Sequence, residues 1–72
     1  MKHNIHRFAA PEVIIEGRTF SQTYIEVIEG KVIDYGKLQE EMAFTEWLCG
    51  TIEVKTNGKG LLYACYENRR LK

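Results

Sequence analysis

The chain lacks a net charge and a long apolar run. Its ten basic and ten acidic side chains cancel, so no overall field draws it to nucleic acid or to an acidic membrane surface. No stretch approaches the roughly 20 apolar residues of a membrane span, and residues 1–8 lack the apolar core of a secretory signal. These absences predict a soluble cytoplasmic protein that does not bind membranes.

Cysteine is scarce. The two cysteines, Cys49 and Cys65, fit no zinc-finger spacing and are too few for a disulfide scaffold. We therefore expect both to be reduced and at least one to be buried as a small hydrophobic side chain. A bridge between them would require that their strands pair.

The length and composition predict one folded domain. Hydrophobic residues make up 44% of the 72 residues and charged residues 28%, which is typical of a globular protein and argues against disorder. A chain this short buries only about 60% of the surface that its unfolded form exposes. We therefore expect residues 1–72 to form a single domain with a thin core and with frayed ends at residues 1–8 and 68–72.

A near-repeat organises the first half of the chain. Residues 12–18 read EVIIEGR and residues 26–31 read EVIEGK, so each apolar run ends at Glu-Gly followed by a basic residue. Glycine supplies the positive φ that hairpin turns require, and the β-branched residues before it favour strands. The pattern predicts tight turns at Gly17 and Gly30. For Gly30, a type I′ turn and a type I turn with a glycine bulge are both compatible with the sequence.

A second hairpin is predicted around Asn57 and Gly58, because both residue types tolerate the left-handed conformation of a type I′ turn. Before this turn, residues 51–55 alternate strictly, which places Ile52 and Val54 toward a core. After it, residues 61–66 are apolar on both faces. We expect this last strand to be central in the sheet or covered by a partner.

The segment 37–49 is ambiguous. Residues 37–43 are good helix formers, so a short helix over 37–49 would make the domain α+β. Residues 44–48 have the aromatic and β-branched composition of a strand, and we favour a loop followed by a strand. The chain as a whole then predicts a mainly β fold, a small antiparallel β-sandwich or half-open barrel of about five strands.

Residues 24–36, followed after a loop by Gly50-Thr51-Ile52-Glu53-Val54, resemble the small composite β-domain of amidohydrolases of the dihydroorotase and cytosine deaminase type. In that family a Gly-x-Ile-Asp segment leads to two histidines that bind the catalytic metal. Here Lys55 and Asn57 stand at those two positions. The resemblance therefore implies a free-standing β-module without the catalytic barrel and without its metal site.

No residue pattern specifies a catalytic, cofactor or metal site. His3 and His6 have no third ligand nearby in the sequence. Glu40, Glu41 and Glu46 read as a solvated acidic loop, because adjacent carboxylates do not face each other across a cleft. The flanking glycines of Lys59 do not make a phosphate loop, since a strand rather than a helix follows. We expect a protein that is not an enzyme and that carries no cofactor.

Large side chains supply the remaining candidate site, a set of core or interface anchors at Trp47, Leu61, Tyr63 and Tyr66. Open strand edges and two-faced apolar strands favour association. We therefore expect a non-catalytic module for self-association or for binding an unknown protein partner. The alternative is a small nucleic-acid-binding barrel that uses Phe44, Trp47, Tyr63 and Tyr66 as stacking platforms with the basic cluster at residues 69–72, which the zero net charge does not favour.

Overall fold

The computed structural model describes residues 5–39 and 42–72, and within them every regular element is a strand. The strands are β1 (His6–Ile15), β2 (Arg18–Ile28), β3 (Lys31–Lys37), β4 (Thr45–Trp47), β5 (Thr51–Thr56), β6 (Leu62–Tyr66) and β7 (Arg69–Arg70). The mainly β prediction is confirmed. The described part of segment 37–49 is a strand end, a loop and a short strand rather than a helix; Glu40 and Glu41 lie outside the described residues.

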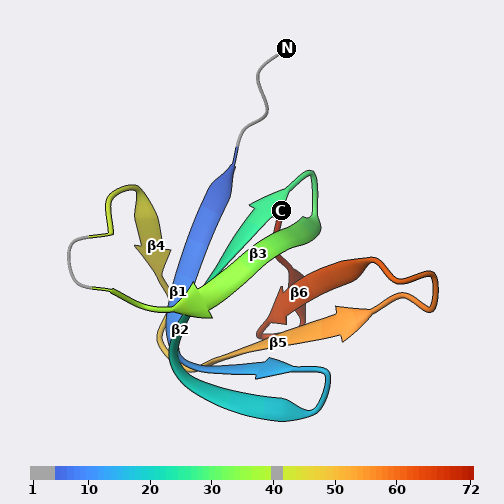
Figure 1. The fold of residues 1–72 in the computed structure, drawn as a ribbon, viewed down its shortest axis with the longest axis horizontal. Coiled ribbons are helices and arrows are strands. Elements are labelled where there is room, and N and C mark those ends of the chain that lie inside the picture. Colours follow the sequence, from blue (N-terminus) through green and yellow to red (C-terminus); the bar gives the residue numbers. More distant parts are fainter. Residues whose placement is uncertain (1–4, 40–41) are drawn as a thin grey trace.

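All seven strands belong to one sheet with the order β3-β2-β1-β5-β6-β7, and β4 pairs with β1 beside β5 (Figure 1). The hairpin pairs β1–β2, β2–β3, β5–β6 and β6–β7 are antiparallel. β1, however, is parallel to both β4 and β5. The sheet is therefore mixed, whereas the sequence predicted an antiparallel one, because hairpin signals report only on strands that follow each other in the chain.

Three two-residue turns connect strands. In Glu16-Gly17 and in Glu29-Gly30 both residues have positive φ, 48° and 84° in the first and 50° and 80° in the second. These values identify type I′ turns and settle the choice that the sequence left open at Gly30. Glu67-Asn68, with φ of 50° and 65°, makes a third turn of this kind between β6 and β7.

The Asn57-Gly58 hairpin forms differently from the prediction. Of these two residues only Gly58 has a left-handed φ (87°), and the connection from β5 to β6 spans residues 57–61. Asn57 Oδ1 accepts hydrogen bonds from the backbone N–H groups of Lys59 (2.8 Å) and Leu61 (3.3 Å). The two-residue type I′ turn is therefore wrong, because the asparagine side chain, rather than its backbone conformation, closes a longer loop.

β1 and β2 bend together in their middle (Figure 1). Their pairing passes from Ala10–Thr23 to Glu12–Ser21 without a partner for Pro11, which has no N–H to donate. Val13 then faces the core although it lies three residues after the core residue Ala10. Gln22, which lies opposite Pro11, is also unpaired and has a left-handed φ of 49°, so the in–out alternation shifts in both strands while their register is kept, and one face of the curled sheet stays apolar.

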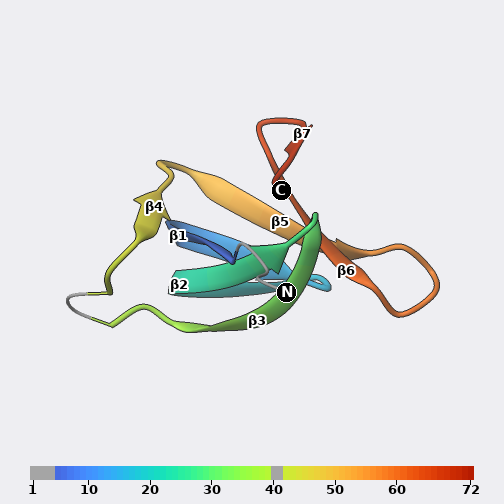
Figure 2. The same ribbon diagram turned by 90° about the horizontal axis from the view of Figure 1, so that it is seen from above.

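The core lies on the concave side of this curled sheet, between β1–β2–β3 and β5–β6 (Figure 2). Ile52 and Val54 belong to it and their neighbours in β5 are exposed, which confirms the alternation predicted for this strand. Where the ends of the curled sheet approach each other, Arg70 Nη2 donates a hydrogen bond to the Gly30 carbonyl (3.2 Å). The core consists of Phe8, Ala10, Val13, Ile15, Ile25, Val27, Val32, Ile52, Val54 and Ala64.

Both ends of the chain take part in the sheet. Residues 1–4 lie outside the described residues, whereas His6–Phe8, within the range expected to fray, begin β1, and Phe8 is buried in the core. At the other end, Leu71 packs against the core and its N–H donates to the Ala64 carbonyl (2.9 Å).

The cysteines differ from expectation in one respect. Both are free, but Cys49 is exposed and Cys65 half-buried, so neither is a buried core residue. Cys65 lies on the face of β6 opposite the core, since its register partner is the exposed Glu53. Separately, the described residues contain no helix that is long and apolar enough to cross a membrane.

Candidate functional site

One row of residues crosses the convex, outer face of the strands β4-β1-β2-β3. Ala9 is the register partner of Trp47 on β4 and of Tyr24 on β2, and Tyr24 is in turn the partner of Gly36 on β3. Ala9 is only 1% exposed although it lies outside the core cluster. A Cβ atom on Gly36 would lie 3.0 Å from the Tyr24 hydroxyl oxygen. The row is therefore a packed strip, with Trp47 at its β4 end.

The adjacent row holds a partly buried ion pair. Arg7 Nε and Nη2 donate to Glu26 Oε2 at 2.9 and 2.7 Å. The remaining Arg7 donor, Nη1, bonds the Ala43 carbonyl at 2.8 Å. Charge-assisted bonds of this kind are stronger than neutral ones. One guanidinium group thus ties β1 to β2 and to the loop that precedes β4.

This loop presents Phe44 to solvent. The Ala43 carbonyl also accepts a bond from the Thr45 hydroxyl (3.2 Å), so the backbone just before Phe44 is held from two sides. Phe44 itself has φ of +55° and is 97% exposed. A left-handed conformation is rare for an aromatic residue and is costly unless the surroundings enforce it. Stabilising contacts therefore hold a turn whose phenyl ring is exposed to solvent.

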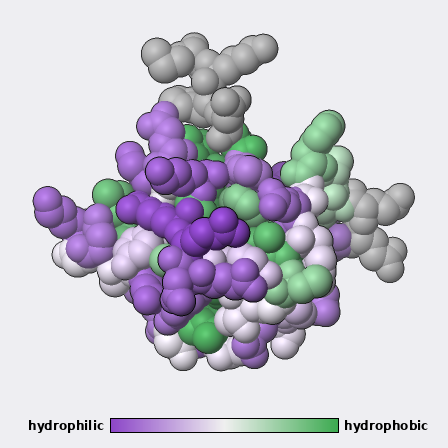
Figure 3. All heavy atoms as spheres, turned by 180° about the vertical axis from the view of Figure 1, so that it is seen from behind, coloured by the Kyte–Doolittle hydropathy of each residue, from purple (hydrophilic) through white to green (hydrophobic). Residues whose placement is uncertain are grey.

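Figure 3 shows the side of the molecule on which β5 and β7 lie. Its surface is mostly hydrophilic, and a hydrophobic projection stands at the edge where residues 42–44 lie. Half-exposed Trp47 (48%) follows three residues after Phe44. Two large aromatic side chains are therefore displayed at one edge of the sheet.

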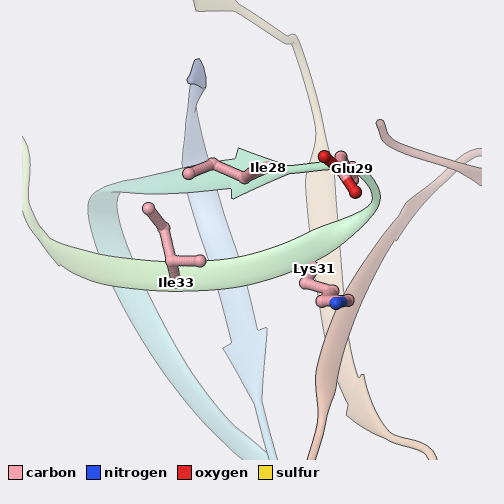
Figure 4. A pocket seen from close by; sticks show the side chains of 4 residues that line it. All are labelled: Ile28, Glu29, Lys31 and Ile33. Carbon is pink, nitrogen blue, oxygen red and sulfur yellow. The ribbon is translucent and has the colours of Figure 1, made fainter. Parts of the chain in front are cut away.

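A shallow apolar hollow lies at the opposite edge, on the outer face of β2 and β3. It has a volume of about 210 Å³ and is lined by Ile28, Glu29, Lys31 and Ile33. Figure 4 shows Ile33 extending from β3 toward Ile28 on β2. Ile33 has no register partner, because the pairing steps from Val27–Val32 to Glu26–Asp34. This β-bulge re-aims the Ile33 side chain, which is 50% exposed.

The anchors predicted from the sequence do not form one site. Tyr63 and Tyr66 are both half-buried on β6, but their register partners, Lys55 and Ile52, show that they point to opposite faces. Leu61 lies in the β5–β6 loop and is 47% exposed, apart from the β4 edge that carries Trp47. The exposure of Trp47 excludes a core role, so its role as an interface anchor stays a prediction.

Both tyrosines are engaged within the chain. The guanidinium carbon of Arg70 lies 4.8 Å from the centre of the Tyr63 ring, a cation–π contact that covers one ring face. The Tyr66 hydroxyl donates to the Cys49 carbonyl oxygen. Burial raises the pKa of the Tyr66 phenol above its ordinary value, and the nearby Glu67 and Cys49 add to the rise. Tyr66 therefore stays a protonated donor well above neutral pH.

The candidate metal ligands are dispersed. His6 Nε2 lies 3.3 Å from Glu46 Oε1, and His6 Nδ1 lies 2.9 Å from the Lys72 carbonyl oxygen, to which it donates. Within residues 5–39 and 42–72 no group of three or more His, Cys, Asp or Glu side chains is placed to hold a metal. His3, Glu40 and Glu41 lie outside the described residues.

The sequence pointed to Phe44 only as one aromatic of the nucleic-acid alternative, and it did not single out Ile33 or Arg7. Phe44 begins an aromatic and β-branched run that reads as strand, yet the strand starts at Thr45. Nothing in the local sequence distinguishes an exposed phenylalanine at a strand entrance from a buried one, and the β-bulge at Ile33 depends on the partner strand. The one departure from a strand pattern in this segment is that residues 42–44 do not alternate between apolar and polar side chains.

No protein-family model matches the chain, and comparisons with curated proteins and with solved structures found no match.

Proposed function

We propose that the chain is a non-catalytic interaction module that presents Phe44 and Trp47, at the β4 edge of its sheet, to a protein partner. The observation that carries this proposal is the fully exposed Phe44 on a turn held by Arg7 and Thr45. Aromatic side chains dominate the energetics of protein interfaces. A rigid turn also reduces the entropy that is lost when such a side chain binds.

The described polar side chains support a binding role over a catalytic one. His6 pairs with Glu46, and Arg7 pairs with Glu26. A general acid or base needs a proton-transfer group directed at a substrate site, whereas these groups are directed at each other. The resemblance to the amidohydrolase composite domain, with Lys55 and Asn57 at the two histidine positions, agrees with this proposal.

A nucleic-acid-binding role is the alternative, and the placement of the side chains favours it less. Single-stranded nucleic acid requires open aromatic faces among basic groups. Arg70 covers Tyr63 and bonds Gly30. Among the exposed aromatics, which also include Phe20 and Tyr35, Phe44 and Trp47 flank the acidic Glu46 instead. Protein binding is therefore the better account of the exposed aromatics.

Site-specific photo-crosslinking tests the proposal. A benzophenone amino acid is placed at position 44 and, as a matched control, at position 20, where Phe20 is also an exposed phenylalanine (38%) but lies on β2. In cells that express the chain, illumination should give discrete protein adducts from position 44 and not from position 20. Equal labelling from both positions, or adducts with lipid or nucleic acid alone, would contradict a protein-binding role for Phe44.

A further inference from the structure

We propose that the partner is a second copy of this chain, and that Phe44 of one copy fills the hollow at Ile28 and Ile33 of the next, head to tail. This inference rests on the proposed function and names its partner. It joins the one fully exposed aromatic of the described residues to an apolar hollow that no side chain of residues 5–39 or 42–72 fills.

The hollow is large enough for a phenyl ring. Its volume is about 210 Å³ and its apolar lining is Ile28 and Ile33. An aliphatic cavity of roughly 150 Å³ in another protein holds benzene. Phe44 does not reach the hollow of its own copy, because β4 and β3 are separated by β1 and β2, a span of about 14 Å at the usual strand spacing.

The two features lie at two edges of the same sheet, and β3 also packs beside β6 without a ladder of hydrogen bonds between them. Within the described residues, β4 hydrogen-bonds only to β1, and β3 only to β2. β4 is parallel to β1, and β3, two antiparallel steps from β1, runs in the same direction. β4 of one copy can therefore add to β3 of another as a parallel strand, which extends the sheet.

The register of this extension follows from the two outer-face rows. One row runs Trp47–Ala9–Tyr24–Gly36 and the next runs Thr45–Arg7–Glu26–Asp34. When the rows continue into the neighbouring copy, Thr45 lies beside Asp34 and Trp47 beside Gly36. Phe44, one residue before Thr45, then lies beside Ile33, one residue before Asp34. In this register the backbone of Phe44 lies level with the β-bulge at Ile33, next to the hollow.

The area of the contact and its two different surfaces determine the strength and the symmetry of the association. Phe44 and the exposed half of Trp47 together offer roughly 200 to 400 Å², and strand pairing adds to this, so the interface belongs to the small class below about 1,200 Å². The association is therefore expected at high micromolar concentrations. A contact between two different surfaces forms rings or open chains rather than a symmetric pair.

A complementation experiment with purified full-length protein tests the inference. Phe44→Ser removes the ring but keeps the hollow, and Ile33→Lys blocks the hollow but keeps the ring; both positions are exposed, and circular dichroism checks that each variant folds. In analytical ultracentrifugation, wild type should grow in mean mass with concentration, and each variant alone should stay monomeric. An equimolar mixture should form heterodimers, since one intact ring meets one intact hollow. Phe20→Ser should associate like wild type.

A wild type that stays monomeric at about 1 mM, above the high micromolar range in which we expect association, would overturn the inference. So would association that survives Phe44→Ser, or a mixture that yields no heterodimer, which would point to a symmetric contact. The crosslinking experiment separates the two proposals. Adducts from position 44 with a different protein would retain the proposed function and reject the second copy, whereas the absence of specific adducts would reject the proposed function itself.

Discussion

The phenol ring of Tyr24 lies across Gly36, so that a β-carbon at position 36 would come within 3.0 to 3.2 Å of its hydroxyl oxygen and two of its ring carbons. Gly36 is the next-to-last residue of β3 and its φ is not left-handed. The glycine is therefore required by the ring above it and not by its backbone conformation.

Replacing Gly36 tests this relationship, because the effect on stability should have opposite signs with and without the Tyr24 ring. Gly36→Ala should destabilise the wild-type protein by about 1 to 2 kcal/mol, because the new methyl group displaces the Tyr24 ring. In a Tyr24→Ala background the same substitution should stabilise the protein by about 0.5 to 1 kcal/mol, because alanine loses less entropy than glycine in a strand. Chemical denaturation of the four proteins measures both values. Equal effects in the two backgrounds would show that the ring does not restrict position 36.

Arg7 should matter for stability and for the Phe44 turn together. Arg7→Met keeps the aliphatic stem but leaves the mostly buried Glu26 carboxylate without its partner, which should cost about 2 to 3 kcal/mol. The variant should also free the Ala43 carbonyl and with it the turn. The control is Arg7→Met combined with Glu26→Gln, which should recover part of the stability but not the self-association. If the double variant recovered both stability and self-association, Arg7 would not be needed to hold the Phe44 turn.

Asn57 should act through its side-chain oxygen. Asn57→Asp keeps the acceptor that Lys59 and Leu61 use, whereas Asn57→Gly and Asn57→Ala remove it. Both deletions should cost about 1 to 2 kcal/mol and the aspartate variant much less. A type I′ turn would instead tolerate glycine, since glycine adopts positive φ without strain. Melting temperatures of the three variants distinguish the two cases.

Trp47 should contribute less to stability than the sequence predicts for a core anchor. A fully buried tryptophan costs about 3 to 5 kcal/mol when it is replaced by alanine. Because Trp47 is 48% exposed, Trp47→Ala should cost about 1 to 2 kcal/mol. It should also weaken self-association. Trp47 is the single tryptophan of the chain, so its fluorescence maximum should shift to the blue as the wild-type concentration rises. An unshifted spectrum in the associated protein would place Trp47 outside the interface.

We expect the Tyr66 phenol to make the free energy of unfolding depend on pH in the alkaline range. Burial raises the pKa of its phenol in the folded state, and a raised pKa contributes stability that is present below the unfolded value of about 10 and is lost as the pH rises through the folded value. The melting temperature should therefore fall above about pH 10. Tyr66→Phe should remove the part of this dependence that the Tyr66 phenol causes, together with its component of the tyrosinate absorbance. An unchanged titration curve would assign that component to another tyrosine.

The sequence anticipates the parts of the fold that short-range chemistry controls. The Glu-Gly turns form where glycine follows an apolar run. Ile52 and Val54 face the core because they alternate with polar residues, which places both on the same face of β5. The parallel neighbours of β1 lie beyond such rules, since they join residues about 40 positions apart in the chain. β4 and β7 are three and two residues long, which is too short for a periodic pattern.

The candidate site was less accessible to sequence reasoning than the fold. Ile33 is exposed because a β-bulge in its pairing with β2 turns its side chain outward, and a bulge leaves no residue signature at this position. Phe44 is exposed because Arg7, distant in sequence, holds the preceding carbonyl. Both features depend on long-range contacts that an apolar residue in isolation does not reveal.

The central position of β1 has a consequence for the order of folding. Of the seven strands, β1 is synthesised first, and β2 and β3 can pair with it as an antiparallel meander as soon as they are synthesised. The other edge of β1 pairs with β4 and β5 through residues 45–54, which are synthesised later. Until then a strand that ends up in the middle of the sheet has the exposed backbone of an edge strand. Non-local parallel pairing is slow relative to hairpin formation. We therefore expect the nascent three-stranded meander to be the species most prone to aggregate, and chaperone binding during synthesis to end once β5 has docked.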